Sequence, residues 1–468
     1  MSETREPTQA VSEAQVLDAL KVVMDPDLQR DIVTLGFVKN VRICGDSVAL
    51  DIELTTPACP VKEQLKQQAV TALKELPGVA TVSVNMTSNV SRRAGGPGSV
   101  DLELLKGVRN IVAVASGKGG VGKSTVSVNL ALALAQSGAK VGLMDSDIYG
   151  PTIPRMLGIE ASAEATEENH IVPLERYGIR LMSMAFLTGN DTPTIWRGPM
   201  VSRLVQQFLS TVEWGELDYL VIDLPPGTGD IQLTLTQTAP LNGAVIVTTP
   251  QDVAVGIARK GLRMFQQVNV PVLGLVENMS TFVCPHCNTP TRLFPHGGAE
   301  ATCEEMGIPL LAEIPFDPEL AMGGDLGEPI VLRDPGSPAA LAFQEAAKNM
   351  AAQLSIVNLA TARVTSVPTE VQALNDHHLS IHWDDGHQSI FSFRKLRAAC
   401  PCASCVDEWT GERRVELADV PEDVFPEEIQ PVGRYALHLR WSDGHSSGIY
   451  SFDLLRGLCE CPSCQAAH

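Results

Sequence analysis

The chain has 468 residues, of which 44% are hydrophobic and 19% charged, and a formal net charge of −20. This length predicts about two to four domains, and the composition is typical of a folded globular protein. The negative charge argues against a nucleic-acid partner, and no apolar run approaches the roughly 18 residues of a membrane span. The polar start has no signal-peptide or transit-peptide pattern, so we expect a cytoplasmic protein with reduced cysteines.

Residues 1–87 are expected to form a small α+β domain. SEAQVLDALKVVM and VKEQLKQQAVTALKEL have helical spacing, whereas VKNVRI and SVALDIEL have the pattern of strands. A Gly- and Ser-rich stretch, SNVSRRAGGPGS, then predicts a flexible linker at 88–106. Cys59 stands between a strand and a helix start, where a thiol pKa can fall, although a small buried hydrophobic role fits equally well.

Residues 107–354 have a different pattern. Short apolar runs such as NIVAVAS, KVGLMDSD, LDYLVIDLPP and GAVIVTTP alternate with longer helical stretches. Continuous Val and Ile runs indicate strands buried on both faces, and the alternation predicts an α/β domain with a doubly wound parallel sheet. We place a second linker at 355–370.

Residues 371–468 contain an internal repeat. LSIHWDDGHQSIFSFRKLRAACPCASC aligns with LHLRWSDGHSSGIYSFDLLRGLCECPSC, with one inserted residue. Both copies contain W-x-D-G-H, S-F, L-R and C-x-C-x-x-C, so one element of this domain was duplicated. The two cysteine clusters hold six of the eleven cysteines, which predicts a small β-rich metal-binding domain.

The clearest motif is GKGGVGKST, which follows an apolar strand and opens a helical stretch. This setting predicts a P-loop, with Lys123 reaching the β/γ-phosphates of a nucleotide and Ser124 placing its hydroxyl on Mg²⁺. A glycine-rich turn that binds nothing is the alternative. The nucleotide-binding residues predicted in this motif are Gly117, Gly119, Gly120, Val121, Gly122, Lys123, Ser124 and Thr125.

Three acidic residues follow apolar strands of the same domain. Asp145 and Asp147 follow one strand and Asp223 ends another, and ligand contacts of doubly wound folds gather at such strand ends. Asp223 suits a Walker B contact to Mg²⁺. The alternative is that these carboxylates only cap the helices that follow.

A C-x-x-C pair lies in TFVCPHCNTPTRLFP. The spacing of Cys284 and Cys287 directs both sulfurs to one metal centre, and a twofold dimer would supply four thiolates to a shared iron–sulfur cluster. A zinc site completed by His296 and Cys303 is a second possibility, and a redox disulfide is a third.

The motifs together resemble a known family. KGGVGKS, with the additional Lys118, resembles the deviant Walker A motif of the MinD/ParA/nitrogenase-iron-protein class. With MDSDIYGP, WRGPM, DLPPGTGD, VENMS and CPHC, residues 107–350 are similar to the Mrp/ApbC iron–sulfur cluster carrier ATPases. The resemblance implies a homodimer with ATP at its interface, where Lys118 reaches the partner's nucleotide, Asp147 positions the attacking water and Asn278 contacts adenine. It also implies a transferable [4Fe–4S] cluster on Cys284 and Cys287.

Both flanking domains have resemblances of their own. DPDLQRDIVTLGFVKNV and ELTTPACP resemble the small PaaD/SufT-type domain of iron–sulfur maturation proteins. The C-terminal domain resembles the zinc-binding domain at the N-terminus of γ-butyrobetaine-hydroxylase-like proteins. That resemblance implies zinc on Cys400, Cys402, Cys405 and His445, a closed Cys₃His set.

The second cysteine cluster goes beyond that resemblance. By the symmetry of the repeat, a second metal site would consist of His387, Cys459, Cys461 and Cys464. A transient set of cluster ligands and unligated relics of the duplication are the two alternatives.

The sequence therefore predicts a homodimeric ATPase that receives an iron–sulfur cluster from a donor and delivers it to apoproteins. Its expected cofactors are ATP, Mg²⁺, a [4Fe–4S] cluster and Zn²⁺, and no membrane or nucleic-acid partner is expected. The alternative is a MinD/ParA-like positioning ATPase, which would need a basic amphipathic tail or a basic surface. Electron transfer like that of the nitrogenase iron protein fits less well, because it would need single cysteines at two separated sites.

Overall fold

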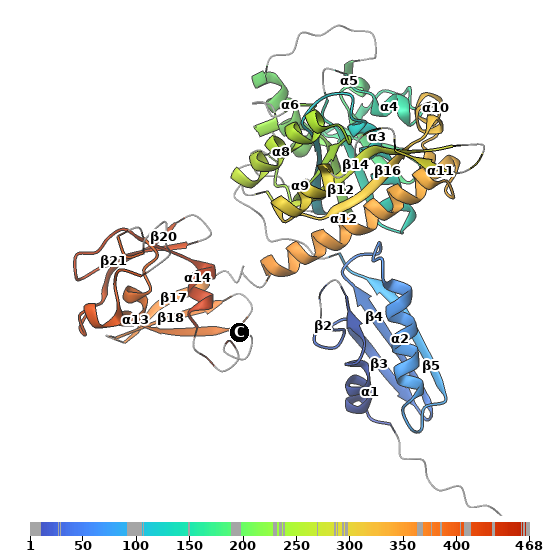
Figure 1. Ribbon diagram of the computed structural model, residues 1–468. Helices are drawn as coiled ribbons and strands as arrows, with labels where there is room; N and C mark the ends of the chain where they lie inside the picture. Colours follow the sequence, from blue (N-terminus) through green and yellow to red (C-terminus); the bar gives the residue numbers. More distant parts are fainter. Residues whose placement is uncertain are drawn as a thin grey trace, which may run out of the picture. The chain divides into compact units, whose positions relative to one another are not determined.

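The computed structural model describes residues 11–26, 28, 30–90, 105, 107–147, 150–188, 198–227, 232–233, 236, 239–268, 270–284, 287, 289–292, 294, 298–362, 368–375, 377–383, 386–402, 404–406, 413–432, 436–459, 461 and 464. The chain divides into two compact units, Met1–Asn358 and Leu359–His468. Figure 1 shows the elements of both units in sequence colours.

The N-terminal elements form a three-stranded sheet with helices packed on one face. Along β4 every second side chain is buried, and these residues pack against the apolar side of α2. β4 pairs antiparallel with β3 and parallel with β5. The elements are α1 (Glu13–Leu20), β1 (Met24–Asp25), β2 (Arg30–Asp31), β3 (Val38–Cys44), β4 (Ser47–Leu54), α2 (Lys62–Lys74) and β5 (Thr81–Ser88).

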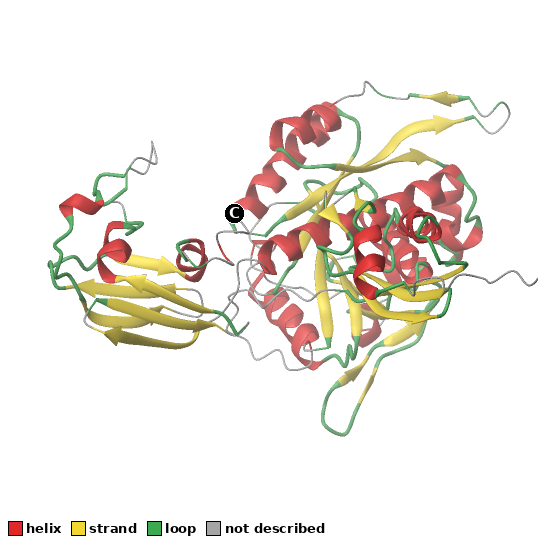
Figure 2. Ribbon diagram, turned by 90° about the horizontal axis from the view of Figure 1, so that it is seen from below, coloured by secondary structure: helices red, strands yellow, loops and turns green. Residues whose placement is uncertain are grey.

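A nine-stranded sheet lies at the centre of the first unit, in the order β10-β11-β7-β12-β6-β13-β14-β15, with β16 also paired to β14. The inner pairs are parallel, and β7 and β13 are buried along their whole length. Helices lie on both faces of this sheet (Figure 2). The predicted α/β class with a doubly wound parallel sheet is thus confirmed.

The strands of this part are β6 (Val108–Ser116), β7 (Val141–Asp145), β8 (Glu164–Ala165), β9 (Ile171–Val172), β10 (Leu174–Arg176), β11 (Ile179–Ser183), β12 (Leu217–Asp223), β13 (Gly243–Thr248), β14 (Val272–Val283), β15 (Pro290–Thr291) and β16 (Leu310–Phe316). The helices are α3 (Lys123–Gln136), α4 (Ile153–Met156), α5 (Ala185–Thr188), α6 (Gly198–Thr211), α8 (Asp252–Gln267), α9 (Gly298–Met306), α10 (Pro318–Leu326), α11 (Ile330–Arg333) and α12 (Pro338–Ala362).

α12 continues into the segment that the sequence predicted as a linker at 355–370. Leu354 and Asn358 remain buried on this helix, and the Asn358 amide donates to the Asn110 side-chain oxygen at 2.8 Å. The apolar spacing of the helix simply continues, and only a short part of the predicted linker separates α12 from β17.

The second unit consists of two similar halves, each with a three-stranded antiparallel sheet and a short helix. The first half has β17 (Pro368–Asn375), β18 (His378–Trp383), β19 (Gln388–Ser392) and α13 (Phe393–Ala398). A short 3₁₀ helix, η2 (Leu417–Asp419), connects the halves. The second half has β20 (Pro426–Val432), β21 (Ala436–Trp441), β22 (Gly448–Ser451) and α14 (Phe452–Gly457).

Candidate functional site

The predicted P-loop connects the buried strand β6 to α3. Gly120 and Gly122 both have a φ of +79°, a conformation that side chains with a Cβ rarely adopt. A Cβ on Gly122 would also collide with the side-chain amide of Asn278, which donates to the Val121 carbonyl at 2.9 Å. The loop is therefore held from the side by β14, and its glycines permit the close approach.

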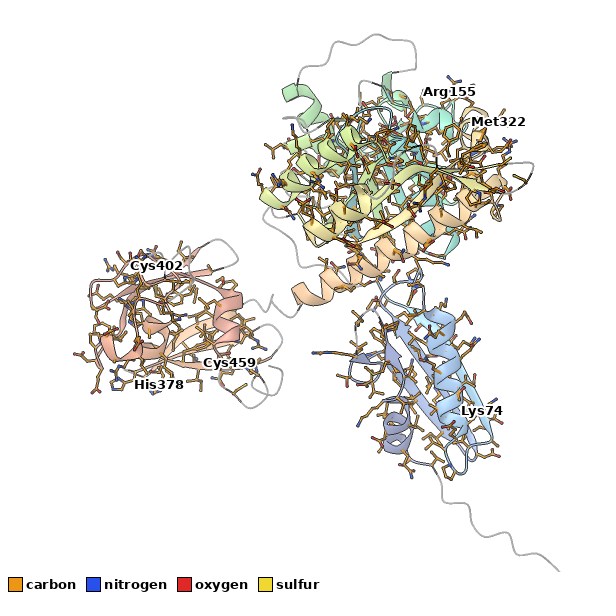
Figure 3. All side chains as sticks on the ribbon, viewed as in Figure 1. Lys74, Arg155, Met322, His378, Cys402 and Cys459 are labelled. Carbon is orange, nitrogen blue, oxygen red and sulfur yellow. The ribbon has the colours of Figure 1, made fainter. Side chains whose placement is uncertain are left out.

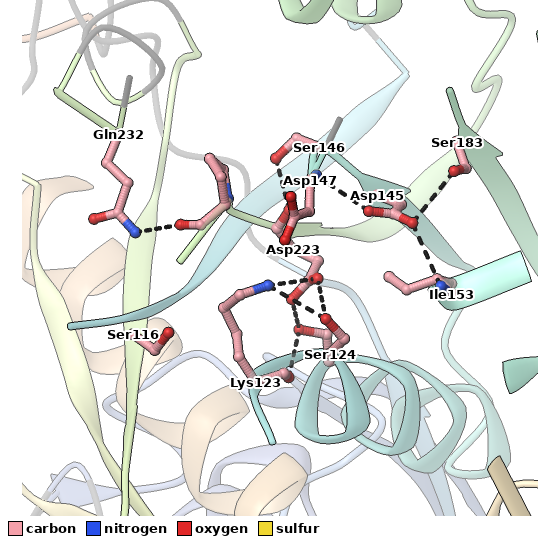
Figure 4. Close-up of polar contacts among 12 residues, drawn as sticks. Ser116, Lys123, Ser124, Asp145, Ser146, Asp147, Ile153, Ser183, Asp223 and Gln232 are labelled. Carbon is pink, nitrogen blue, oxygen red and sulfur yellow. Dashed lines mark hydrogen bonds and ion pairs between the residues drawn. The ribbon is translucent and has the colours of Figure 1, made fainter. Parts of the chain in front are cut away.

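Lys123 and Ser124 converge on Asp223, which ends the neighbouring strand β12. The Lys123 ammonium lies 2.6 Å from one carboxylate oxygen, and the Ser124 hydroxyl donates to the same oxygen at 2.7 Å (Figure 4). The ion pair is buried, with Lys123 only 6% exposed. This arrangement brings together the lysine, hydroxyl and carboxylate that the sequence assigned to phosphate and Mg²⁺ binding.

Sequence reasoning missed Ser127. Its hydroxyl donates to the second Asp223 oxygen at 2.6 Å and so fixes the orientation of the carboxylate. Ser127 lies one helical turn after Lys123, and that spacing is the signal that could have identified it.

Asp145 and Asp147 lie in different surroundings. Asp145 pairs in register with Asp223 on adjacent strands, is 1% exposed, and accepts hydrogen bonds from Ser183 at 3.2 Å and from the backbone N–H of Asp147 at 3.1 Å. Burial, and next the nearby charge of Asp223, raises the pKa of Asp145 to about 8. The hydrogen bonds of Asp145 thus hold together the carboxyl end of β7 and its neighbours, whereas Asp147 lines the cavity.

A cavity of about 550 Å³ opens above the loop, large enough for a nucleotide. Its walls come from the P-loop, from α4 and α10, and from residues of β14 and the end of β16. Arg155, which lines it, is labelled in Figure 3. The predicted residues that line it are Lys118, Gly119, Gly120, Gly122, Lys123, Ser124, Thr125, Asp147 and Asn278. Gly117, Val121, Asp145 and Asp223 are not among its lining residues.

Cys284 and Cys287 lie between β14 and the short strand β15, which pairs with it. The backbone N–H of Cys284 donates to the Thr289 carbonyl at 3.2 Å, and the Cys287 sulfur lies 3.2 Å from the Thr289 hydroxyl. Hydrogen bonding, first from the Thr289 side chain, holds the pKa of the exposed Cys287 thiol below its usual range. A lowered pKa favours the thiolate, which is the form that binds a soft metal.

The alternative zinc site would need His296 and Cys303 as further ligands beside Cys284 and Cys287. Cys303 is buried in α9, where burial and then Glu277 raise the pKa of its thiol to about 11. His296 lies outside the described residues. Within the described part of the chain, no further His, Cys, Asp or Glu joins Cys284 and Cys287 in a compact group of three or more possible ligands.

Two such groups do occur in the second unit. One is Cys400, Cys402, Cys405 and His445, and the other is His387, Cys459, Cys461 and Cys464. In the first group the Nε2 atom of His445 lies 3.2, 3.5 and 3.8 Å from the three sulfurs. Arg397 donates to the Cys405 sulfur at 3.5 Å and is itself held by Asp443 at 2.7 Å, so the group has charged outer support that the sequence did not indicate.

Comparison with known proteins identifies the family of the central domain. Residues 107–351, more than half of the chain, match the family described as NUBPL iron-transfer P-loop NTPase. The chain belongs to this family. Residues 13–84 match an iron-sulfur cluster assembly protein family, and residues 371–456 match the N-terminal domain of γ-butyrobetaine-hydroxylase-like proteins.

Individual proteins similar to this chain include carrier and assembly proteins. An "Iron-sulfur cluster carrier protein" of Synechocystis sp. is 48% identical over 351 residues, which cover 74% of this chain and 98% of the relative. The "Fe-S cluster assembly factor HCF101, chloroplastic" of Arabidopsis thaliana is 42% identical over 464 residues, covering 98% of this chain and 85% of the relative. A solved nucleotide-binding protein from Archaeoglobus fulgidus, in complex with ADP, is 43% identical with a TM-score of 0.44, covering 48% of this chain and 90% of that one.

Proposed function

We propose that this chain is an ATP-hydrolysing carrier that holds an iron–sulfur cluster on Cys284 and Cys287 and delivers it to apoproteins. The observation that carries the proposal is the position of this thiol pair. It directly follows β14, the strand whose Asn278 holds the P-loop, so one element contacts both the nucleotide loop and the metal-binding turn. Family membership and the names of the relatives support the same function.

The thiol count supports a dimer as the working form. Among the described residues, one chain offers two thiols here, Cys284 and Cys287, whereas a [4Fe–4S] cluster usually has four thiolate ligands. A homodimer with twofold symmetry would double the pair across its axis. Two ligands from each chain also bind less firmly than four from one, which suits a cluster that must be released.

The nucleotide site supports Mg·ATP as the ligand. Lys123 would exchange its contact with Asp223 for the phosphates, and Ser124 would turn its hydroxyl to Mg²⁺ with Asp223 behind it. In the same proposal Lys118 reaches the partner's nucleotide, Asp147 positions the attacking water and Asn278 approaches adenine.

A cytoplasmic location belongs to the proposal too. None of the described helices is long and apolar enough to span a bilayer.

Zinc is the proposed occupant of the Cys400, Cys402, Cys405 and His445 group. The four donors fit a closed tetrahedral site in number, type and spacing. Two solved MinD proteins from Pyrococcus are each 24% identical to this chain, a likeness that shows the fold alone and lends no support to the positioning-ATPase alternative.

The test is the iron, sulfide and ATPase activity of anaerobically reconstituted protein. In Cys284→Ser and Cys287→Ser, iron and sulfide should fall to background while ATP hydrolysis continues. Lys123→Ala should lower kcat by about 10²–10³-fold and leave the bound iron in place. Cys44→Ser, which changes an exposed cysteine of the N-terminal domain, is the matched control. Wild-type protein that bound zinc but neither iron nor sulfide at this pair would overturn the proposal.

A further inference from the structure

The two halves of the second unit repeat the same local structure. Between β18 and β19, and again between β21 and β22, a glycine has a positive φ, +79° at Gly386 and +85° at Gly444. The backbone N–H of Trp383 donates to the His387 carbonyl at 2.9 Å, and that of Trp441 donates to the His445 carbonyl at 2.8 Å. Each W-x-D-G-H segment therefore presents its histidine in the same way.

The cysteine segments also correspond. Each begins directly after its short helix, where the first cysteine N–H donates back to an arginine carbonyl, Arg397 at 3.3 Å and Arg456 at 3.2 Å. The third cysteine N–H then donates to the carbonyl of the second, at 2.9 Å in Cys405 and 3.1 Å in Cys464. Both clusters thus have the folded turn that lets three sulfurs face one point.

The histidines are exchanged between the halves. His445 of the second half lies among the cysteines of the first, and His387 of the first half lies among those of the second. The Nε2 atom of His387 is 3.3 Å from the Cys459 sulfur and 3.6 Å from those of Cys461 and Cys464. Figure 3 labels one cysteine of each cluster, Cys402 and Cys459, and shows them apart in the unit.

We propose that the second group is a genuine metal site, and that it holds one zinc ion on His387, Cys459, Cys461 and Cys464. A tetrahedral ion with bonds of about 2.3 Å to sulfur and about 2.0–2.1 Å to nitrogen places these donors about 3.6 Å apart. The three observed distances from His387 match that edge.

The same spacing favours a single ion over an iron–sulfur cluster at this group. A cluster spreads its ligands over two or more iron atoms, so its thiolates lie farther apart than the edge of a site around one ion. Here all four donor atoms lie within 4.8 Å of one another. Three thiolates and one imidazole with no open position form the closed set that structural zinc prefers.

The exchange gives the two ions a structural role. Each ion would join the histidine of one half to the three cysteines that follow the short helix of the other half. Two ions would therefore make two links between the halves. A metal bound in this way stabilises the folded state by its binding free energy, because the unfolded chain has no such site.

The second site should release its ion first. Of its ligands only Cys459 is buried, whereas Cys400 and Cys405 are both buried in the first site. The first site also has the Arg397–Asp443 pair beside its sulfur. Chelators and water therefore reach the second ion more easily.

The first experiment is the zinc content of the purified full-length chain, measured by plasma mass spectrometry in a Cys284→Ser background so that the carrier pair adds no metal. Two zinc ions per chain are expected, with one remaining in Cys461→Ser and one in Cys402→Ser. His378→Ala changes a histidine of the same unit outside both groups and should keep both ions.

The second experiment tests the exchange. With Cys402→Ser removing the first site, zinc release to the chelator 4-(2-pyridylazo)resorcinol should become at least about tenfold faster on adding His387→Ala. Adding His445→Ala should leave the release rate unchanged, and His387→Cys should restore slow release because a fourth thiolate replaces the imidazole. These outcomes do not depend on the carrier function, which is read from iron and sulfide.

Three results would overturn the proposal. One zinc ion per chain, unchanged by Cys461→Ser, would make the second cluster an unligated relic. Loss of iron and sulfide in place of zinc in Cys461→Ser would make it a cluster-binding set. An effect of His445→Ala in place of His387→Ala in the Cys402→Ser background would refute the exchange.

Discussion

Glu277 is a buried carboxylic acid in the middle of β14, one residue before Asn278. It is 2% exposed, and its register partner on β16 is Glu313. Burial, followed by the charges of Glu313 and Glu300, raises the pKa of Glu277 from 4.5 to about 7. A residue of the nucleotide-binding strand therefore titrates close to neutral pH.

The raised pKa predicts a pH-dependent stability. Between pH 4.5 and about 7 the folded chain keeps a proton that the unfolded chain has lost, so the free energy of unfolding falls as pH rises and is constant above that window. Glu277→Gln cannot ionise, so its free energy of unfolding should not show this fall, which amounts to about 3 kcal/mol in wild type. Its melting temperature relative to wild type should rise between pH 5 and pH 7. Glu304→Gln, an exposed change on α9, should follow wild type at every pH, and an equal response of both variants would refute the assignment.

At the scale of elements, β14 links two sites that appear separately in the sequence. Asn278 binds the P-loop, Met279 has a φ of +59°, and the pairing with β16 is irregular between Asn278 and Phe282. Cys284 then follows the last residue of the strand. A change at the nucleotide loop therefore has a direct backbone path to the thiol turn.

This link predicts that Mg·ATP protects the thiol pair. If nucleotide closes a dimer around the four thiols, alkylation of Cys284 and Cys287 by iodoacetamide should slow severalfold at saturating Mg·ATP, as measured by mass spectrometry. Asn278→Ala should retain the unprotected rate and lose the protection. Cys44 provides the internal control, because it is exposed in the N-terminal domain. Equal slowing of Cys44 would mean that the reagent, and not the dimer, responds to nucleotide.

The sequence was most informative about these elements where the signals are local. Apolar runs located the strands, and the glycine-rich loop located the P-loop, because each depends on residues close together in the chain. The contacts from Asn278 to Val121 and from Ser127 to Asp223 join residues 157 and 96 positions apart. They follow from the order of strands in the sheet, which no local pattern contains. Asp145 was predicted as a nucleotide-binding residue; in the structure it is 1% exposed and accepts a hydrogen bond from Ser183 of β11, a contact that no local pattern indicates.

At the scale of the whole molecule, the relatives differ in whether they have room for the second unit. The Synechocystis relative matches over 351 residues that make up 98% of its length, so it has no room for a unit of this size. The Arabidopsis relative matches across 98% of this chain. The contacts within the chain divide it in the same way, with the first unit ending at Asn358.

This division predicts that the carrier activity survives removal of the second unit. A chain that stops after Ala362 keeps all of α12 and should retain wild-type ATP hydrolysis and cluster binding, while its zinc content falls to background. A chain that stops after Ser355 removes the Asn358 amide, which bonds to the buried Asn110 side chain at 2.8 Å. Losing that hydrogen bond and the helical turn that carries it should lower the melting temperature by a few degrees, because one intramolecular hydrogen bond contributes about 0.5–1.5 kcal/mol. Loss of ATP hydrolysis in the chain that stops after Ala362 would instead show that the second unit takes part in the activity of the first.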